Sequence, residues 1–192
     1  MEILKLINNG SRQLKDKNIY SYQLDSEILL SKALNKTREE LLINLNQNIE
    51  PQKIHYFNSL IDRRSSREPI AYILKEKEFW SKKFIVNNNT LIPRPETELM
   101  VEKIVKIFKQ KSIYVLDIGT GTGCILLSLL SELNTSKGMG IDISQKAIQI
   151  AKANSEKHKL KHRTKFYRRS LSEVFLNKFD LMISFIPLAG IT

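Results

Sequence analysis

The second half of the chain alternates between short apolar runs and longer segments whose apolar residues recur at helical spacing. This alternation predicts strands near 113–117, 138–142, 164–168 and 179–184, with helices over 124–133 and 145–158. It favours a doubly wound α/β domain, because parallel strands need a crossover helix between them. We expect the strands to lie in the order third, second, first, fourth, with a ligand crevice where that order reverses.

The first of these strands ends in a glycine-rich turn that reads VLDIGTGTG. Asp117 ends the strand, and Gly119, Gly121 and Gly123 let the backbone turn sharply and let a ligand approach closely. The third glycine comes one residue too early for the G-x-G-x-x-G dinucleotide fingerprint, and the chain has no G-K-[ST] phosphate loop. A tight turn without any ligand is the alternative interpretation.

A second carboxylate supports a ligand at this turn. Asp142 follows Gly123 by 19 residues and ends the second strand, where a carboxylate can accept both ribose hydroxyls of an adenosine. Capping of the next helix is the alternative role for Asp142. Because Ser144 can provide that cap, we expect Asp142 to be free for the ligand.

The first seventy residues have apolar residues at helical spacing and predict a small bundle of about four helices. Thr37 and Glu40 form a capping-box pattern, and Pro51 suits the first turn of a further helix. Residues 71–92 contain the apolar runs AYIL and KFIV, which predict a β-hairpin. Thr97 is expected to cap a helix that continues through residue 108.

The formal net charge of +11 is uneven, because residues 152–169 hold eight Lys and Arg side chains against Glu156 alone. A solvated helix face and loop explains such a run, and a docking surface for RNA or an acidic partner is the alternative. No apolar run is long enough for a membrane helix, and the N-terminus does not resemble a secretory signal. These features predict a cytoplasmic protein without a membrane segment.

Metal and thiol chemistry are not expected. The single cysteine, Cys124, excludes an internal disulfide and a cysteine-rich zinc site, and we interpret it as a small buried residue rather than an activated thiol. The three histidines lack ligand spacing to a carboxylate or to the cysteine, so no metal site is predicted.

Several motifs together resemble those of the release-factor glutamine methyltransferase family. The motifs are DSEILL (25–30), RREPIAYIL in the 63–74 region, EFW (78–80), LIPRPETE (91–98), the DIGTGTG turn and Asp142. The resemblance implies an α/β fold: a small N-terminal helical bundle plus a Rossmann-like class I methyltransferase domain. It implies a substrate-docking domain at 1–70, a hairpin linker at 71–92 and a partial S-adenosylmethionine-binding domain at 93–192, which we expect to be incomplete at its C-terminus.

The resemblance also implies the reaction and the site. The expected reaction is transfer of a methyl group from S-adenosylmethionine to the glutamine amide in the Gly-Gly-Gln motif of class-1 peptide release factors. The implied cofactor-binding residues are Asp117, Gly119, Thr120, Gly121, Thr122, Gly123, Asp142 and Ser170. Arg94 and Glu96 lie in a loop that the resemblance places beside the cofactor pocket, with a purely structural turn as the alternative.

The chain departs from this family after the fourth predicted strand. The family has Asn-Pro-Pro-Tyr there, and its Asn side chain and a proline carbonyl accept hydrogen bonds from the target amide. Phe185, Ile186, Pro187 and Leu188 occupy those positions, so we expect no intact catalytic motif and impaired activity. The alternatives are a nucleic-acid amino methyltransferase and a non-catalytic remnant that binds a release factor.

Overall fold

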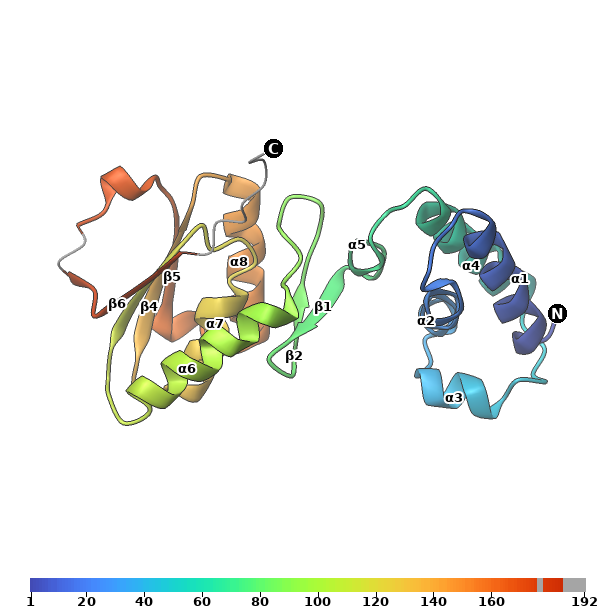
Figure 1. Ribbon diagram of the computed structural model, residues 1–192, viewed down its shortest axis with the longest axis horizontal. Coiled ribbons are helices and arrows are strands. Elements are labelled where there is room, and N and C mark those ends of the chain that lie inside the picture. The colour runs from blue at the N-terminus through green and yellow to red at the C-terminus, as the bar shows by residue number, and fades with distance from the viewer. Residues whose placement is uncertain (176–177, 185–192) are drawn as a thin grey trace. The chain divides into compact units, whose positions relative to one another are not determined.

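The chain divides into two compact units, Met1–Leu74 and Lys75–Thr192, in the computed structural model of Figure 1. The structure describes residues 1–175 and 178–184. The predicted positions of the Asn-Pro-Pro-Tyr motif, 185–188, therefore lie outside the described residues. Each unit has its own apolar core.

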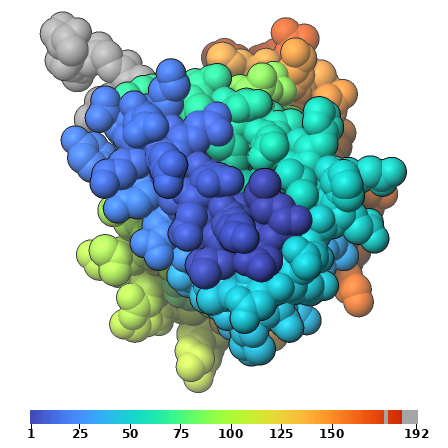
Figure 2. Space-filling model, turned by 90° about the vertical axis from the view of Figure 1, so that its right-hand side faces the viewer, coloured from blue at the N-terminus to red at the C-terminus, as the bar shows by residue number. Residues whose placement is uncertain are grey.

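The first unit is a helical bundle, as predicted. Its helices are α1 (Ile3–Asp16), α2 (Tyr22–Leu34), α3 (Arg38–Ile43), α4 (Pro51–Ser65) and α5 (Ile70–Leu74). The space-filling view in Figure 2 shows segments from α1 to α4, coloured blue to cyan, packed into one continuous surface. Buried side chains such as Leu6, Leu29 and Phe57 form the core beneath it.

The local signals in this unit act as expected. The Thr37 hydroxyl accepts from the Glu40 amide at 3.2 Å, and the Glu40 carboxylate accepts from the Thr37 amide at 2.7 Å. This confirms the capping box, which satisfies two free amides at the start of α3. Pro51 is the first residue of α4, where its missing N–H has no intrahelical partner.

The predicted hairpin is shorter than expected. Strands β1 (Glu76–Phe79) and β2 (Lys82–Ile85) pair antiparallel around Trp80 and Ser81, both at a φ of 52°. The expectation that AYIL is a strand is wrong, because the Pro69 carbonyl accepts from Tyr72 and Ile73 and starts the helical turn of α5. A short apolar run does not by itself distinguish a strand from a helix. The break between the units consequently follows Leu74, and the hairpin belongs to the second unit.

The second unit has the predicted parallel sheet. Its elements are η1 (Pro95–Thr97), α6 (Glu98–Phe108), β3 (Tyr114–Ile118), α7 (Cys124–Glu132), β4 (Lys137–Asp142), α8 (Gln145–Lys157), η2 (Lys161–Arg163), β5 (Thr164–Arg168), η3 (Leu171–Glu173) and β6 (Leu181–Ser184). The strand order is β5-β4-β3-β6 with every pairing parallel, which confirms the predicted order and its reversal beside β3. Figure 1 shows α6, α7 and α8 on one face of this sheet.

One predicted cap is wrong. The Thr97 side chain is buried and accepts no hydrogen bond from the start of α6. The chain enters α6 directly from η1, so Thr97 already has helical backbone angles and its hydroxyl does not face the first free amides. The Glu98 carboxylate instead accepts from the Trp80 amide at 2.8 Å and ties the hairpin to the start of α6.

Candidate functional site

The glycine-rich turn between β3 and α7 has the backbone that its sequence predicts. Gly119, Gly121 and Gly123 have φ angles of 71°, 55° and 77°, a region that strains any residue with a Cβ. A Cβ at Gly119 would meet nothing within 4 Å, and one at Gly121 would meet only a backbone oxygen at 3.9 Å. The turn therefore has an open side, which a ligand can approach closely.

Asp142 holds this turn in place. One of its carboxylate oxygens accepts from the Gly121 amide at 3.0 Å, and the other accepts from the Ser144 amide at 2.8 Å. The Ser144 hydroxyl caps α8 by accepting from Ala147, as predicted, and the Asp142 carboxylate already accepts from two backbone amides, so its availability to a ligand stays a prediction. The turn and the start of α8 both meet the end of β4, so a carboxylate there faces two backbone amides. Each oxygen retains a further lone pair for a ligand.

The cavity beside the turn has two walls from distant parts of the sequence. Its volume is about 160 Å³, and Gly119 to Thr122 and Asp142 form the first wall. Residues 89–94 form the second wall and include Arg94. The structure thus brings together six of the predicted residues: Gly119, Thr120, Gly121, Thr122, Asp142 and Arg94.

Asp117 lies beneath the turn rather than in the cavity lining. Its carboxylate is 2% exposed and accepts from the Thr120 hydroxyl at 2.6 Å. Burial raises the pKa of Asp117 to about 6, and the neighbouring negative charge of Asp142 acts in the same direction. The group is therefore ionised at neutral pH and places a buried negative charge directly under the open side of the turn.

The other predicted residues lie outside this cavity lining. Ser170 forms a capping box with Glu173 at the start of η3, and Glu96 is exposed in η1. Gly123 is closed in by packing, since a Cβ there would meet the Ala151 side chain at 3.3 Å. Cys124, by contrast, lines the cavity, but burial raises the pKa of its thiol to about 12, so the start of α7 does not activate this thiol.

Sequence reasoning missed one polar side chain at the turn. Asn154 lies in α8, is fully buried and donates to the Thr122 carbonyl at 3.0 Å. The signal that could have found it is its spacing, because it lies three residues after Ala151 on the helix face that carries buried alanines. A buried amide on such a face needs hydrogen-bonding partners.

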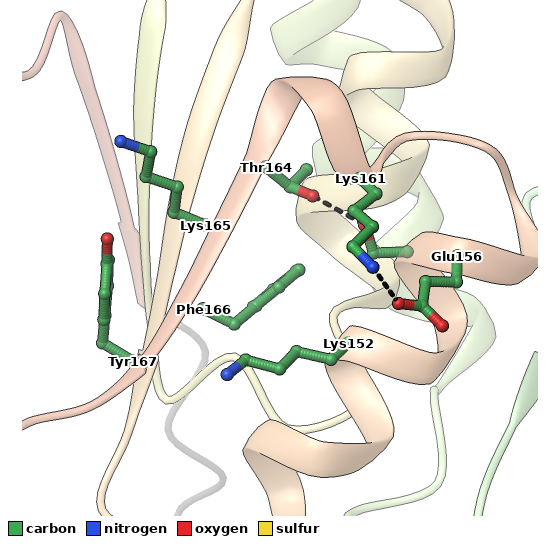
Figure 3. A pocket seen from close by; sticks show the side chains of 8 residues that line it. Lys152, Glu156, Lys161, Thr164, Lys165, Phe166 and Tyr167 are labelled. Atoms are coloured by element: carbon green, nitrogen blue, oxygen red, sulfur yellow. Dashed lines mark hydrogen bonds and ion pairs between the residues drawn. The ribbon is translucent and has the colours of Figure 1, made fainter.

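Two wider grooves lie away from the glycine turn, one between α8 and β5 and the other at the starts of β3, β4 and β5. The groove in Figure 3 measures about 460 Å³ and is lined by Lys152, Lys161 and Lys165. We assign the candidate site to the smaller cavity, because it has the open glycine turn and the carboxylate at the sheet reversal. Within the part of the chain that the structure describes, neither groove includes these features.

Some of the basic side chains in 152–169 have partners within the protein. The Lys161 ammonium pairs with Glu156 at 2.6 Å, as Figure 3 shows. The Arg163 guanidinium donates to the carbonyls of Leu130, Leu133 and Ser136, and Arg168 donates to the Ile143 carbonyl. Part of the charge therefore supports the fold internally, and an RNA partner for this run stays a prediction.

Among residues 1–175 and 178–184, no cluster of three or more His, Cys, Asp and Glu side chains is suited to a metal ion. The helices within those ranges also include none with the length and hydropathy needed to cross a membrane.

Comparison with known proteins finds a matching family model for each unit. A model described as the PrmC N-terminal domain matches residues 5–74, and a methyltransferase domain model matches residues 109–192. The release factor glutamine methyltransferase of Buchnera aphidicola subsp. Baizongia pistaciae is 41% identical over 97% of this chain and 67% of its own length. The enzyme of the same name from subsp. Acyrthosiphon pisum is 40% identical over 97% of this chain and 66% of its own length.

A bifunctional methyltransferase of Rickettsia typhi is 37% identical over 96% of this chain, which spans 40% of that relative's length. The chain thus spans about two thirds of the Buchnera relatives and two fifths of the Rickettsia relative. The matched domains and the strand order agree with the fold that the sequence predicts. The chain belongs to the release factor glutamine methyltransferase family.

Proposed function

We propose that this chain binds S-adenosylmethionine and transfers its methyl group to the glutamine amide in the Gly-Gly-Gln motif of class-1 peptide release factors. The observation that carries this proposal is the 41% identity to a release factor glutamine methyltransferase over 97% of the chain, which spans both units. The buried, unpaired cysteine fits the reducing cytoplasmic setting in which translation takes place.

The cavity at the glycine turn suits part of this cofactor. The remaining lone pairs of Asp142 can accept the ribose hydroxyls, and the open side of Gly119 and Gly121 allows a close approach. The Arg169 amide donates to the Asp142 carbonyl, and this link between the segment before Ser170 and Asp142 supports a proposed role for Ser170 at the adenosine end. Typical ligand pockets measure about 300–1,000 Å³, so the described walls enclose only part of the cofactor.

When bound, the cofactor would supply a methyl group on a cationic sulfonium. In the proposed transfer the amide nitrogen bonds to the methyl carbon as the carbon–sulfur bond breaks, the neutral thioether S-adenosylhomocysteine leaves, and the nitrogen then loses a proton to solvent. The chain contributes orientation and electrostatics. The ionised Asp117, buried beneath the turn, favours a cationic ligand above it. Holding two reactants in line can supply about 7–11 kcal/mol of the barrier reduction, so positioning accounts for most of the proposed rate.

The helical unit is the proposed docking site for the release factor. A surface groove of about 430 Å³ at the start of α2 is lined by Tyr20, Leu24 and Arg38, among others. Tyr20 is fully exposed, and tyrosine and arginine side chains are enriched at protein interfaces. The match to the PrmC N-terminal domain over 5–74 supports a protein substrate rather than a nucleic acid.

Replacement of the family's Asn-Pro-Pro-Tyr motif by Phe185–Leu188 is the reason to expect slow methyl transfer. Phe185 offers no acceptor for the N–H groups of the target amide, and an unpaired buried donor costs about 1–3 kcal/mol. A misplacement of about 1 Å can cost a further ~100-fold. We therefore propose slow methyl transfer by the chain with Phe185–Leu188 in place of Asn-Pro-Pro-Tyr.

Radiolabelled methyl transfer from S-adenosylmethionine to a purified class-1 release factor tests the reaction. A release factor whose Gly-Gly-Gln glutamine is replaced by alanine is the control, and RNA is the competing acceptor. We expect slow labelling that needs the glutamine. Labelling of the alanine control or of RNA would contradict the proposed substrate, and turnover near ~1 per second would contradict the slow rate. Failure to bind S-adenosylhomocysteine in calorimetry would contradict the cofactor.

A further inference from the structure

The Asn154 side chain connects two segments that lie far apart in the sequence. It is fully buried in the last two turns of α8, and its amide makes three hydrogen bonds. The oxygen accepts from the Ile85 amide at 2.7 Å, while the nitrogen donates to the Ile85 carbonyl and to the Thr122 carbonyl, both at 3.0 Å. Three of the four hydrogen-bonding positions of the amide are thereby used.

The contact with Ile85 fixes the end of the hairpin. Ile85 is the last residue of β2, and Asn154 pairs with both of its backbone polar groups as a neighbouring peptide would. One helical turn later, His158 packs against the Phe84 ring at 4.6 Å between ring centroids. The same face of α8 therefore holds two successive residues of β2.

The contact with Thr122 fixes the glycine turn from the side of α8. Thr122 lies between Gly121 and Gly123, both at positive φ. Glycines restrict the backbone little, so a hydrogen bond to the Thr122 carbonyl limits the conformations that this part of the turn can adopt. Asp142, at the end of β4, accepts from the Gly121 amide, and Asn154 donates to the carbonyl of the next residue, Thr122. The turn is thus held at adjacent residues by two different elements.

One of these two segments belongs to a wall of the candidate cofactor cavity, and the other leads into the opposite wall. Thr122 is part of the first wall, and β2 leads within four residues to Asn89, where the second wall begins. A single buried amide therefore ties the first wall to the strand that delivers the second wall. Loss of this amide leaves three backbone groups without their partner, the buried Thr122 carbonyl and the two part-buried polar groups of Ile85.

We propose that Asn154 is a positioning residue that sets the spacing between the two cavity walls and thereby the affinity for the cofactor. This inference rests on the proposed function, because it takes the cavity to be the S-adenosylmethionine site. Asn154 does not line the cavity, so it acts through Ile85 and Thr122 rather than by touching the ligand.

The neighbouring Ser155 provides a matched control. It is 2% exposed and lies on the same helix, and its hydroxyl hydrogen-bonds to the Thr164 hydroxyl at 2.6 Å. This bond faces β5 rather than the hairpin or the turn. Ser155→Ala therefore removes a buried hydrogen bond from α8 and leaves both cavity walls tied.

The test compares Asn154→Ala, the milder Asn154→Ser and Ser155→Ala in the 192-residue chain. Amide hydrogen exchange without ligand should speed up together in the 84–94 and 119–124 segments for both Asn154 variants and in neither segment for Ser155→Ala. Faster exchange in only one wall, or equal effects of Asn154→Ala and Ser155→Ala, would overturn the inference.

Calorimetry with S-adenosylhomocysteine provides the second readout. We expect roughly tenfold weaker binding for Asn154→Ala, as for the net loss of one buried hydrogen bond, and unchanged binding for Ser155→Ala. Equal affinities of Asn154→Ala and the unchanged chain would overturn the inference. If the unchanged chain does not bind this ligand, the proposed function fails, while the exchange pattern still decides whether Asn154 couples the walls.

Discussion

Replacing Asp117 by asparagine should stabilise the second unit at neutral and alkaline pH. The carboxylate is 2% exposed, and burial is the main cause of its raised pKa. Asparagine has nearly the same shape, and its side-chain oxygen can still accept from the Thr120 hydroxyl, which now lies 2.6 Å from the carboxylate. The substitution therefore removes the buried charge with little change in shape, and the cost of turning one oxygen, beside the Leu126 backbone amide, into an NH₂ group does not depend on pH.

The magnitude follows from the pKa of Asp117. Its rise from 3.8 to about 6 corresponds, at about 1.4 kcal/mol per pH unit, to at most about 3 kcal/mol. Because the folded state holds the proton more tightly than the unfolded state, the stability of the unchanged chain should fall as the pH rises from about 4 through about 6. The advantage of Asp117→Asn should be absent near pH 4 and fully developed above pH 7.

The assay is urea unfolding followed by the fluorescence of Trp80, the only tryptophan of the chain. Its indole donates to Glu132 at 2.9 Å and packs against the core of the second unit, so the signal reports that unit. Asp180→Asn, at an exposed carboxylate at the other end of the sheet, is the control. A stability difference for Asp117→Asn that does not change between pH 4 and pH 8 would refute the reasoning.

Three further predictions test other parts of the chain. Asp142→Ala should weaken S-adenosylhomocysteine binding by roughly 1–3 kcal/mol in calorimetry, and Asp180→Ala should not; equal affinities for all three chains would remove Asp142 from the site. Cys124 should stay unreactive toward a disulfide reagent at pH 8 until urea is added, because burial raises its pKa to about 12, and rapid labelling of the folded chain would contradict this. Arg64→Leu should lower the unfolding free energy of the helical unit by about 3 kcal/mol, because the buried Asp25 carboxylate would lose the guanidinium that now lies 2.7 Å away. Hydrogen exchange of the α2 amides measures this loss, and unchanged protection of those amides would contradict the prediction.

The two backbone hydrogen bonds that Asp142 accepts give a second reason why Asp142→Ala should weaken binding. The carboxylate accepts from two backbone amides, so Asp142→Ala loosens the glycine turn as well as removing a ligand contact. Comparison with Asn154→Ala separates these effects, since that change loosens the turn and leaves the Asp142 carboxylate in the cavity.

Local sequence signals determined much of this architecture. Short apolar runs separated by helical segments were enough to predict the strands, and their parallel pairing followed because a crossover helix separates each strand from the next. The positive φ angles of Gly119, Gly121 and Gly123 were also predictable, because only glycine adopts them without strain. The Thr37–Glu40 capping box formed as expected because its partners lie three residues apart.

Tertiary structure decided what depends on partners far apart in the chain. AYIL became helical rather than extended because Ile73 packs into the core of the bundle. Within the basic run at 152–169, Arg163 serves the fold because its guanidinium donates to backbone carbonyls about thirty residues earlier in the chain. Asn154 gained its role from Ile85, which lies 69 residues away. Sequence patterns report local backbone preference and burial, whereas the partners of a buried polar group are set only when distant elements pack together.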